Sequence, residues 1–258
     1  CPSCGNPINP AAGVKYQAEP IYRSPTDFGF TFNAVYNSRS VTQVVRPLAL
    51  PWTGNLSGTW MTSFIRPLVV VQMSGATPAI VAIQRPDGKV FEFRAPVSGN
   101  EYVHDAIVSD RLTRLVDGGG ATIGWRFHTA ATDEEELFDS AGSFMASFDR
   151  TGLARRFAYA DGVGGFYYGA TSTVAQTAGS PFPPGYVAPD ACNEPAGFTH
   201  QLDGAGNPVA SPPAGRLLCA VDPFGRALNF QYDAAGRMIR MADPAGGLTT
   251  FEYDGATA

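Results

Sequence analysis

The C-terminal part of the sequence contains a 21-residue unit twice in succession. Residues 215–235 read GRLLCAVDPFGRALNFQYDAA and residues 236–256 read GRMIRMADPAGGLTTFEYDGA, with nine identical positions in an ungapped alignment. A fixed period of this kind is typical of repeat proteins, in which each unit buries its apolar face by packing on its neighbours. The repeat therefore predicts a structural scaffold rather than a catalytic domain.

Each copy is predicted to contain two β-strands. Aromatic and polar residues alternate in Phe230–Tyr232 and in Phe251–Tyr253, and residues two apart in a strand lie on the same face, so both rings of a copy point one way. The run Arg237–Met241 alternates as well, and we expect Ile239 and Met241 on its buried side. Two short strands per unit make a continuous ribbon of β-hairpins.

The strands are separated by two predicted turns. Asp233–Gly236 and Asp243–Gly246 both begin with aspartate and end with glycine, the residue that adopts a positive φ at little cost. An aspartate at the start of a turn accepts hydrogen bonds from backbone N–H groups a few residues on. We therefore assign these carboxylates to the turns and not to acid/base chemistry.

A degenerate third copy lies upstream. Five of its residues keep the spacing of the glycine, aspartate, glycine, phenylalanine and tyrosine of the repeat: Gly142, Asp149, Gly152, Phe157 and Tyr159, which match Gly215, Asp222, Gly225, Phe230 and Tyr232. The stretch between the copies, about 163–214, is rich in glycine, proline, alanine and serine, and it is either an inserted loop or an eroded unit. The predicted structural signature residues are Gly142, Asp149, Gly152, Phe157, Tyr159, Asp222, Gly225, Phe230, Tyr232, Asp233, Gly236, Asp243, Gly246, Phe251, Tyr253 and Asp254.

The composition supports an all-β fold with a substantial core. Hydrophobic residues make up 44% and aromatic residues 12% of the 258 residues, which is enough to build an extensive core. With 29 glycines and 21 prolines the chain is rich in turn residues without reaching the range of disordered proteins. We predict one β domain over residues 1–137 and the repeat region over residues 138–258.

Charge and hydropathy exclude two classes of partner. The net charge of −5 argues against a nucleic-acid-binding surface, and no run of 18 apolar residues exists that would span a membrane. The strongest apolar run, Leu68–Val71, predicts a buried strand. The single run of acidic residues, Asp133–Glu136, is expected to form a solvated turn or edge and not a cation site.

The cysteines offer weak metal and disulfide signals. Cys1 and Cys4 have the spacing of half a zinc ribbon, but a tetrahedral site needs two more ligands and no second pair of this kind follows. They are the only metal candidates; a redox role or lipid attachment at Cys1 is an alternative, and a structural or incidental role is favoured. Cys192 and Cys219 lie in or beside the insertion, where a disulfide between them is possible.

The chain shows no recognisable catalytic or cofactor-binding pattern. His104, His128 and His200 are far apart and lack a neighbouring acidic residue or cysteine at catalytic spacing, and His128 is expected to be a strand residue. The sequence contains no nucleophile elbow, zinc-protease motif, phosphate-binding loop or dinucleotide fingerprint. Asp203–Asn207 resembles a calcium loop only loosely and is expected to be a turn. We therefore predict no catalytic residue and no cofactor.

The repeat units resemble the YD repeats of Rhs (rearrangement hot spot) proteins. The resemblance lies in Asp222–Arg226, Phe230–Asp233 and Gly236–Met238. Independently, Gly5–Pro10 and Gly13–Gln17 are similar to the opening of the uncharacterised domain that begins many Rhs proteins. The resemblance covers most of the chain outside about 163–214, and it identifies residues 1–137 as an Rhs-associated N-terminal domain.

The resemblance implies a spiralling β-shell built from YD hairpins, which in bacterial members encloses a C-terminal toxin delivered to other cells. It implies that the partners are the rest of the parent chain and its toxin, with secretion machinery or cell-surface glycans as further partners. The expected location is exported, secreted or at the cell surface. Since the sequence begins at Cys1 and stops just after a Tyr-Asp pair, we expect it to be part of a longer polypeptide. Asp243–Leu248 is similar to the self-cleavage motif of the family, but the strand residues after it favour an ordinary repeat turn.

Three functions are compatible with these features. The favoured one is a non-catalytic segment of the toxin-enclosing shell. The alternative is a surface module that binds carbohydrate or a partner cell through exposed aromatic residues. Its candidates, most of which we expect in the core, are Trp52, Trp60, Trp125, Tyr167 and Tyr168. An enzyme, such as a self-cleaving protease or a metal hydrolase, is the least favoured.

Overall fold

The fold is all-β, as the sequence predicts. The structure, a computed structural model, describes residues 8–9, 14–26, 28–38, 60–85, 90–105, 108–167 and 192–253. These residues contain strands, turns and bends without a helix, so none of them forms a helix able to cross a membrane. The paired strands run antiparallel, with short connections between neighbours.

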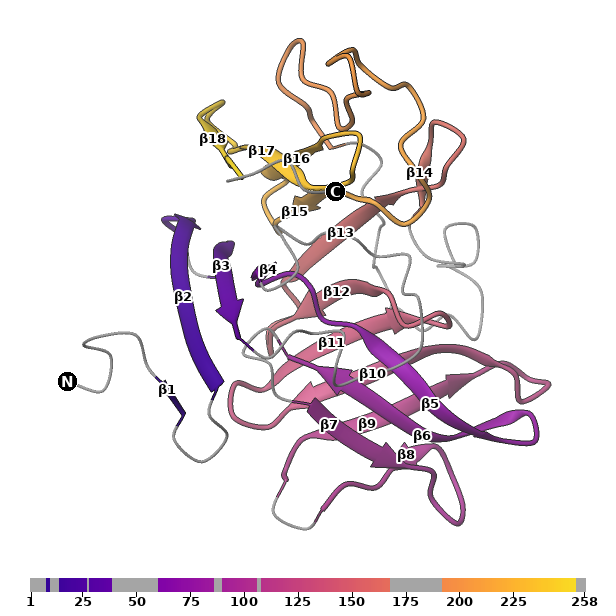
Figure 1. Ribbon diagram of the computed structural model, residues 1–258. Coiled ribbons are helices and arrows are strands. Elements are labelled where there is room, and N and C mark those ends of the chain that lie inside the picture. Colours follow the sequence, from indigo (N-terminus) through magenta and orange to yellow (C-terminus); the bar gives the residue numbers. More distant parts are fainter. Residues whose placement is uncertain are drawn as a thin grey trace.

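One large sheet forms most of the molecule. Its strands follow the order β18-β17-β16-β15-β13-β12-β11-β10-β9-β8, with β14 paired to the end of β13 (Figure 1). The bounds are β8 Glu101–Tyr102, β9 Arg111–Val116, β10 Thr122–Thr129, β11 Glu134–Asp139, β12 Phe144–Phe148, β13 Ala154–Ala160, β14 Phe166–Tyr167, β15 Leu217–Val221, β16 Ala227–Tyr232, β17 Met238–Ala242 and β18 Leu248–Thr250. Almost all neighbours in this sheet are also neighbours in sequence, as expected for a ribbon of hairpins.

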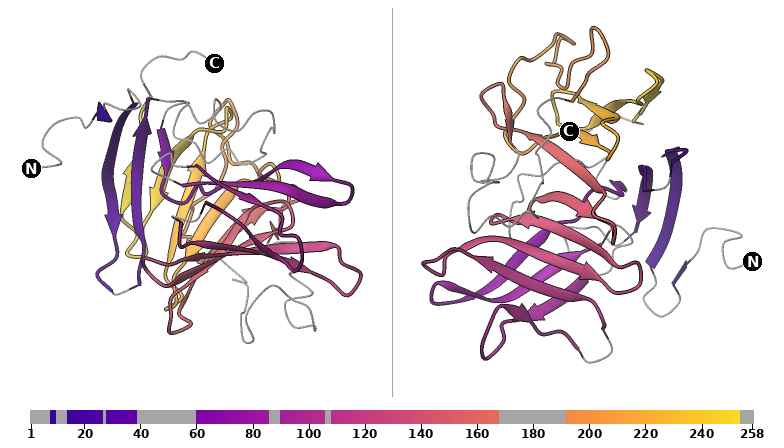
Figure 2. Two further views of the ribbon diagram at one scale, coloured as in Figure 1. Left: turned by 90° about the horizontal axis from the view of Figure 1, so that it is seen from below. Right: turned by 180° about the vertical axis from the view of Figure 1, so that it is seen from behind.

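Two small sheets come from the N-terminal part of the chain. The first has the order β1-β2-β3-β4 and the second β5-β6-β7. The bounds are β1 Ile8–Asn9, β2 Val14–Arg23, β3 Thr31–Asn37, β4 Trp60–Thr62, β5 Leu68–Ser74, β6 Thr77–Gln84 and β7 Val90–Arg94. Figure 2 shows both small sheets on the same side of the large sheet, with β2 and β3 facing its C-terminal strands.

The main core fills the space between the large sheet and the two small sheets. Phe93 of β7 meets Phe127 of β10 with ring centroids 6.0 Å apart, and Phe32 of β3 meets Phe230 of β16 at 5.4 Å. All four rings belong to one cluster of buried apolar residues. The face of the large sheet that looks away from this cluster is called the outer face below.

The large sheet continues across the predicted insertion. β13 pairs directly with β15, with Phe157 opposite Ala220 and Ala158 opposite Cys219. Within the described residues, the chain between them adds no strand between β13 and β15, and β14 pairs only at the end of β13. Both interpretations of this stretch, an inserted loop and an eroded unit, remain predictions. Part of it, residues 168–191, lies outside the described residues.

The boundary predicted between residues 137 and 138 falls inside β11. This strand pairs with β10 on one side and with β12 on the other, in the same sheet. The sheet thus joins the repeat strands to β8–β10 of the N-terminal part. The division into two domains remains a prediction.

Two predictions about exposure are wrong. In the run Leu68–Val71 only the first two side chains are buried, and Val71 is 48% exposed, because the β5–β6 hairpin extends beyond the core (Figure 2). In the acidic run Asp133–Glu136 the last side chain is buried, with only 1% of Glu136 exposed. Its carboxylate forms ion pairs with Arg66 and Arg85, at 2.5 Å from Nη1 of Arg85. A buried carboxylate between two guanidinium groups is a link between layers and not a solvated edge.

Candidate functional site

The first part of the site is the turn that closes each repeat hairpin. In the turn that begins at Asp222, the backbone N–H of Asp222 donates to the carbonyl of Arg226 at 2.9 Å, and that of Gly225 donates back to the carbonyl of Asp222 at 3.1 Å. Oδ1 of Asp222 accepts from the N–H groups of Phe224 (2.9 Å) and Arg226 (3.0 Å). The carboxylate therefore satisfies donors that the tight turn leaves without a carbonyl partner.

The same turn recurs along the whole sheet. At eight positions of the described chain, the backbone N–H of an aspartate donates to the carbonyl of the residue four places on, and the N–H of that residue donates to the aspartate carboxylate: Asp117, Asp139, Asp149, Asp161, Asp203, Asp222, Asp233 and Asp243. A glycine with positive φ follows three residues after each of them. Asp203–Asn207 is thus a repeat-type turn, as predicted.

Hydrogen bonds favour the ionised form of the carboxyls of Asp203 and Asp161. At Asp203, the hydrogen bonds from Asn207 lower the pKa of the carboxyl below its ordinary value. At Asp161, the backbone N–H groups of Val163 and Gly165 have the same effect on the pKa. A carboxylate that accepts several N–H groups is a poor general acid or base at neutral pH. The carboxylate of Asp243 makes the same turn contacts, with Oδ1 accepting from the N–H groups of Ala245 and Gly247.

The second part of the site is a β-bulge that recurs in each copy. The register shifts by one residue where the first strand of a copy pairs with the preceding strand. The extra residues occupy the same repeat position in all three copies, at Met145, Leu218 and Ile239. A bulge interrupts the hydrogen-bond ladder and changes which side chains face the core. This explains why Met238 is buried beside Met241, while Ile239, predicted on the buried side, is only half-buried.

The third part is the tyrosine of the Tyr-Asp pair. In each copy its hydroxyl donates to the backbone carbonyl 15 residues earlier, which precedes the bulged residue. The three bonds are Tyr159 to Phe144 (2.7 Å), Tyr232 to Leu217 (2.8 Å) and Tyr253 to Met238 (2.5 Å). The tyrosine thus ties the chain near the end of its hairpin's second strand, or just beyond that end at Tyr253, to the bulge in the first strand. Because Tyr159 makes the corresponding hydrogen bond, the degenerate upstream copy shares this feature with the two clear copies.

An arginine covers the tyrosine ring in the two clear copies. The guanidinium of Arg216 lies 4.8 Å from the ring centroid of Tyr232, and that of Arg237 lies 5.0 Å from Tyr253. Nη1 of Arg216 also donates to the carbonyl of Gly236 at 2.7 Å, which connects one copy to the next. The cation–π contact helps to hold the ring in place. The upstream copy departs here, because Ser143 occupies the arginine position.

Burial makes these tyrosines difficult to ionise. It raises the pKa of Tyr253 to about 12, and it raises the pKa values of Tyr232 and Tyr159 further. A phenol that stays protonated keeps its hydroxyl hydrogen for the bond to the carbonyl. The tyrosines therefore act as hydrogen-bond donors and not as bases.

This shift predicts a loss of stability in alkali. An unfolded tyrosine ionises near its ordinary pKa of 10.0, whereas the folded residues keep their protons until the pH rises well above it. Their contribution is complete below pH 10.0 and is lost as the pH rises toward the folded pKa values. We expect the urea midpoint of unfolding to fall steeply above pH 10.0, measured by fluorescence at a series of pH values. A midpoint that stays constant well above that pH would contradict the raised pKa values.

The remaining signature residues take structural positions. Phe157 packs on Phe64 of the small-sheet layer at 5.2 Å, and Phe230 lies fully buried in the same cluster. Phe251 is partly buried, but the predicted strand Phe251–Tyr253 is wrong: β18 ends at Thr250. One backbone bond continues the pairing, from Phe251 N–H to the carbonyl of Ile239. Asp254, Cys1 and Cys4 lie outside the described residues, so the structure does not test the metal candidates.

The repeat glycines fall into two classes, which a pair of substitutions separates. Gly142 and Gly152 both have positive φ, at 89° and 83°. A methyl group at Gly142 would overlap the carbonyl of Leu68, whereas a methyl group at Gly152 would meet nothing. We expect Gly152→Ala to cost about 1 kcal/mol of unfolding free energy from the backbone alone. Gly142→Ala should cost at least about 2–3 kcal/mol, because the overlap adds to that strain. Equal losses in urea unfolding would show that the layers do not meet closely at Gly142.

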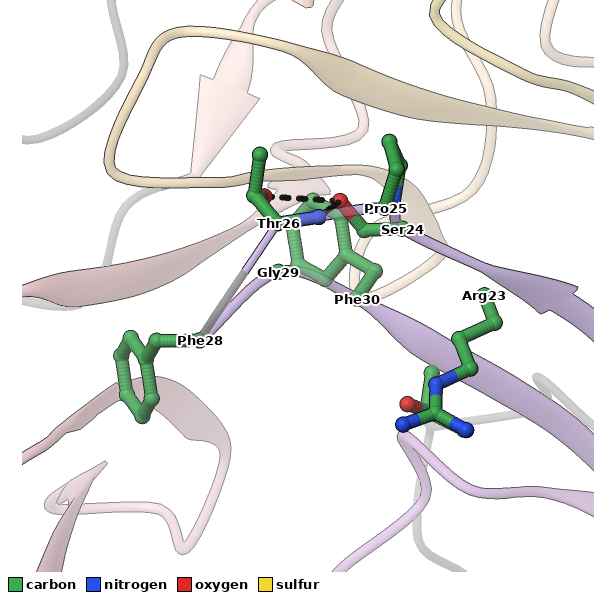
Figure 3. A pocket seen from close by; sticks show the side chains of 8 residues that line it. Arg23, Ser24, Pro25, Thr26, Phe28, Gly29 and Phe30 are labelled. Atoms are coloured by element: carbon green, nitrogen blue, oxygen red, sulfur yellow. Dashed lines mark hydrogen bonds between the residues drawn. The ribbon is translucent and has the colours of Figure 1, made fainter.

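The turn between β2 and β3 connects the small-sheet layer to a repeat turn. It forms a pocket of about 520 Å³ lined by Arg23, Ser24, Pro25, Thr26, Phe28, Gly29, Phe30 and Thr31 (Figure 3). Nη2 of Arg226 donates to the hydroxyls of Ser24 (3.1 Å) and Thr26 (2.5 Å). The same guanidinium pairs with Asp222 of the repeat turn. The polar groups here are used in joining the two layers.

The outer face of β13, β15 and β16 is covered by the returning end of the insertion. Cys192 and Cys219 form a disulfide, with Cα atoms 5.7 Å apart, which confirms the pairing considered from the sequence. Around it lies a second, smaller cluster of buried apolar residues. Both faces of β15 are therefore buried, and the insertion is held firmly against the repeats.

One cluster was missed by the sequence analysis. His200, for which the sequence shows no acidic residue or cysteine at catalytic spacing, lies with Nε2 3.0 Å from Oε1 of Glu194 and close to Cys192. The spacing Cys192, Glu194 and His200 within nine residues was a signal that could have found it. His128, a strand residue as predicted, also has an acidic neighbour, with Nε2 2.9 Å from Asp133. Both histidines therefore have an acidic partner only five or six residues away in the sequence, which the sequence pattern did not reveal.

Comparison with known proteins agrees with this geometry at the C-terminal hairpins. Residues 212–248 and 232–257 match a family model described as RHS Repeat. These two matches span β15 to β18, with the turns, bulges and tyrosine bonds of the two clear copies. No curated protein matches the chain.

Proposed function

We propose that the chain, whose C-terminal hairpins match the RHS Repeat family, is a non-catalytic segment of an Rhs-type β-shell that encloses a C-terminal toxin for delivery to other cells. The observation that carries the proposal is the regular addition of repeat hairpins to one sheet. Each copy adds two strands, closed by the same turn and tied by the same tyrosine bond. A unit of this kind extends a wall by as many copies as the chain contains.

The chemistry of the repeat supports a structural role. The aspartates of the turns are occupied by backbone N–H groups, and the tyrosines are buried and protonated. The buried carboxylate of Glu136 is neutralised by Arg66 and Arg85. In each case the polar group serves the fold, and we therefore propose that the segment itself has no enzymatic activity.

The proposed location is outside the producing cell. Disulfides persist in oxidising compartments and are rare in the cytosol, so the bond between Cys192 and Cys219 favours export, secretion or display at the cell surface. The proposed partners are the rest of the parent chain, including further repeats and the toxin. Secretion machinery and cell-surface glycans are the further partners that this location would bring.

Electron microscopy of the full-length protein that contains this chain tests the proposal. The expected result is a hollow particle whose wall is built of β-hairpins, with the hairpins of β12–β13 and β15–β16 adjacent in one sheet and density for the toxin inside. A particle with a solid interior and no β-walled cavity would contradict the shell. The control is the same protein truncated before its C-terminal toxin, which should keep the wall and lose the internal density.

The alternative, carbohydrate recognition, finds less support in the described residues. Trp125 is fully buried, and Trp60 packs on Tyr36 with ring centroids 5.3 Å apart. The best exposed ring is Phe224 in a repeat turn, at 58% exposure. Binding to a glycan array that disappears with Phe224→Ala, while the shell remains intact, would favour recognition. Trp52 and Tyr168 lie outside the described residues.

A further inference from the structure

Four potential metal ligands meet on the outer face of the repeats. The Sγ atom of Cys192, a carboxylate oxygen of Glu194 and a ring nitrogen of His200 all lie within 4.8 Å of one another. Cys219 of β15 adds a fourth donor, because its Sγ is bonded to that of Cys192. In the oxidised protein both sulfur atoms are committed to the disulfide. Reduction would leave two thiols, an imidazole and a carboxylate gathered at one place.

The imidazole of His200 is already oriented as in a metal site. Its Nδ1 lies 2.9 Å from the carbonyl oxygen of Phe230, and since a carbonyl only accepts, Nδ1 carries the hydrogen. Nε2 then points toward Glu194. Histidines that bind zinc usually donate their second ring nitrogen to a backbone carbonyl or carboxylate in this way, which fixes both tautomer and ring direction.

Backbone bonds keep His200 in place independently of the disulfide. The N–H of Tyr232 donates to the carbonyl of His200, and the N–H of Leu202 donates to the carbonyl of Tyr232, both at 2.9 Å. Nε2 of Gln231 donates to the carbonyl of Thr199 at 2.7 Å. Cys219 is fixed as well, because it lies within β15 opposite Asn229 of β16. Breaking the disulfide therefore leaves His200 and Cys219 where they are.

We propose that Cys192, Cys219, His200 and Glu194 bind a zinc ion when the disulfide is reduced. A dithiol reductant supplies two electrons and two protons to the disulfide and becomes a disulfide itself. Zinc then binds the two thiols as thiolates and Nε2 of His200 through its lone pair, with release of the two thiol protons and of the proton that joins Nε2 to Glu194. Two sulfurs, one nitrogen and one oxygen form a tetrahedral set suited to Zn²⁺, and the thiolates disfavour Mg²⁺ and Ca²⁺. The side chain of Glu194 is 33% exposed, which gives the ion a path from solvent.

The site would hold the insertion against the repeats in a reducing compartment, where the disulfide cannot persist. Zinc would connect Cys192 to β15 and His200 in place of the sulfur–sulfur bond. The covered outer face would then remain covered both before and after export. This inference concerns the insertion and does not depend on the enclosed toxin.

Zinc and cobalt titrations of the full-length protein test the site. The background is a Cys1→Ser/Cys4→Ser variant, which removes the other candidate ligands predicted from the sequence. After reduction with a phosphine, we expect about one zinc ion bound per chain, and none before reduction. Cobalt in place of zinc should give a thiolate-to-metal charge-transfer band and the visible bands of tetrahedral coordination.

Two histidine variants separate a built site from general metal affinity. His200→Gln should raise the dissociation constant for zinc at least about tenfold, since loss of even an outer-shell partner costs that much. His128→Gln is the matched control, because His128 also faces a carboxylate but has no described cysteine nearby, and it should leave the constant unchanged. Absence of zinc binding after reduction would overturn the proposal, as would binding that survives both Cys192→Ser and His200→Gln. Unfolding of the reduced protein in the presence of zinc would overturn it too.

Discussion

Replacing Tyr232 with alanine is expected to lower the free energy of unfolding by about 3–5 kcal/mol, the usual cost of deleting a large buried ring. Tyr232 is fully buried, its hydroxyl donates to Leu217, and its ring is covered by Arg216. The substitution leaves a cavity, removes the hydrogen bond to the carbonyl beside the bulge, and removes the contact between the ring and the guanidinium of Arg216. Urea unfolding followed by fluorescence, with wild type and variant compared at pH 7, measures the difference.

Replacing Tyr232 with phenylalanine measures the contribution of the hydroxyl group alone to the free energy of unfolding. Tyr232→Phe keeps the ring and should cost about 1–3 kcal/mol, because it removes the donor to a buried carbonyl. Tyr159→Phe should behave alike, whereas Tyr253→Phe should cost less, since that tyrosine is only half-buried. If Tyr232→Phe has no effect on the midpoint, the bond to Leu217 contributes nothing and the tyrosine acts through packing alone.

The period of the sequence predicted the hairpins well but not their bulges. The alternation of apolar and polar residues in Arg237–Met241 predicts that Ile239 is buried, because it assumes a regular hydrogen-bond ladder between the strands. The structure has one extra residue in the first strand of each copy, and Met238 takes the buried position instead. A bulge is set by pairing with the neighbouring strand, so it cannot be read from one strand alone. The Asp-x-x-Gly turns were predictable because every contact within them is local.

The same distinction between local and distant partners explains why the sequence did not predict the outer-face cluster or the burial of Glu136 in the acidic run. Cys192, Glu194 and His200 are close in sequence, but the carbonyl of Phe230 that orients the histidine belongs to a repeat strand 30 residues away. The partners of Glu136 lie still farther away, 70 residues in the case of Arg66 and 51 in the case of Arg85. Nothing within Asp133–Glu136 distinguishes its last carboxylate from the other three. Only the packing of the β5–β7 layer on the large sheet selects it.

Removing this carboxylate is the second substitution with a large expected effect. Glu136→Gln should lower the free energy of unfolding by about 3–5 kcal/mol, because it removes the buried charge that pairs with the guanidinium groups of Arg66 and Arg85. Arg66 and Arg85 lie in the small-sheet part of the chain and Glu136 in β11, so the loss should loosen the contact between layers. Glu135→Gln is the matched control. Its carboxylate is 39% exposed and lies 3.7 Å from Arg126, so we expect a change below about 1 kcal/mol.

The pH dependence of that loss identifies its cause. Burial raises the pKa of Glu136, but attraction and hydrogen bonds from Arg66 and Arg85 outweigh it and hold the pKa below the ordinary value of 4.5. Because the folded pKa is depressed, the stabilisation is complete above pH 4.5 and is lost as the pH falls through the folded value. The difference between wild type and Glu136→Gln should therefore be constant near neutral pH and shrink in acid. A difference that persists unchanged in strong acid would assign the effect to the shape of the side chain, whereas one that shrinks assigns it to the charge between the layers.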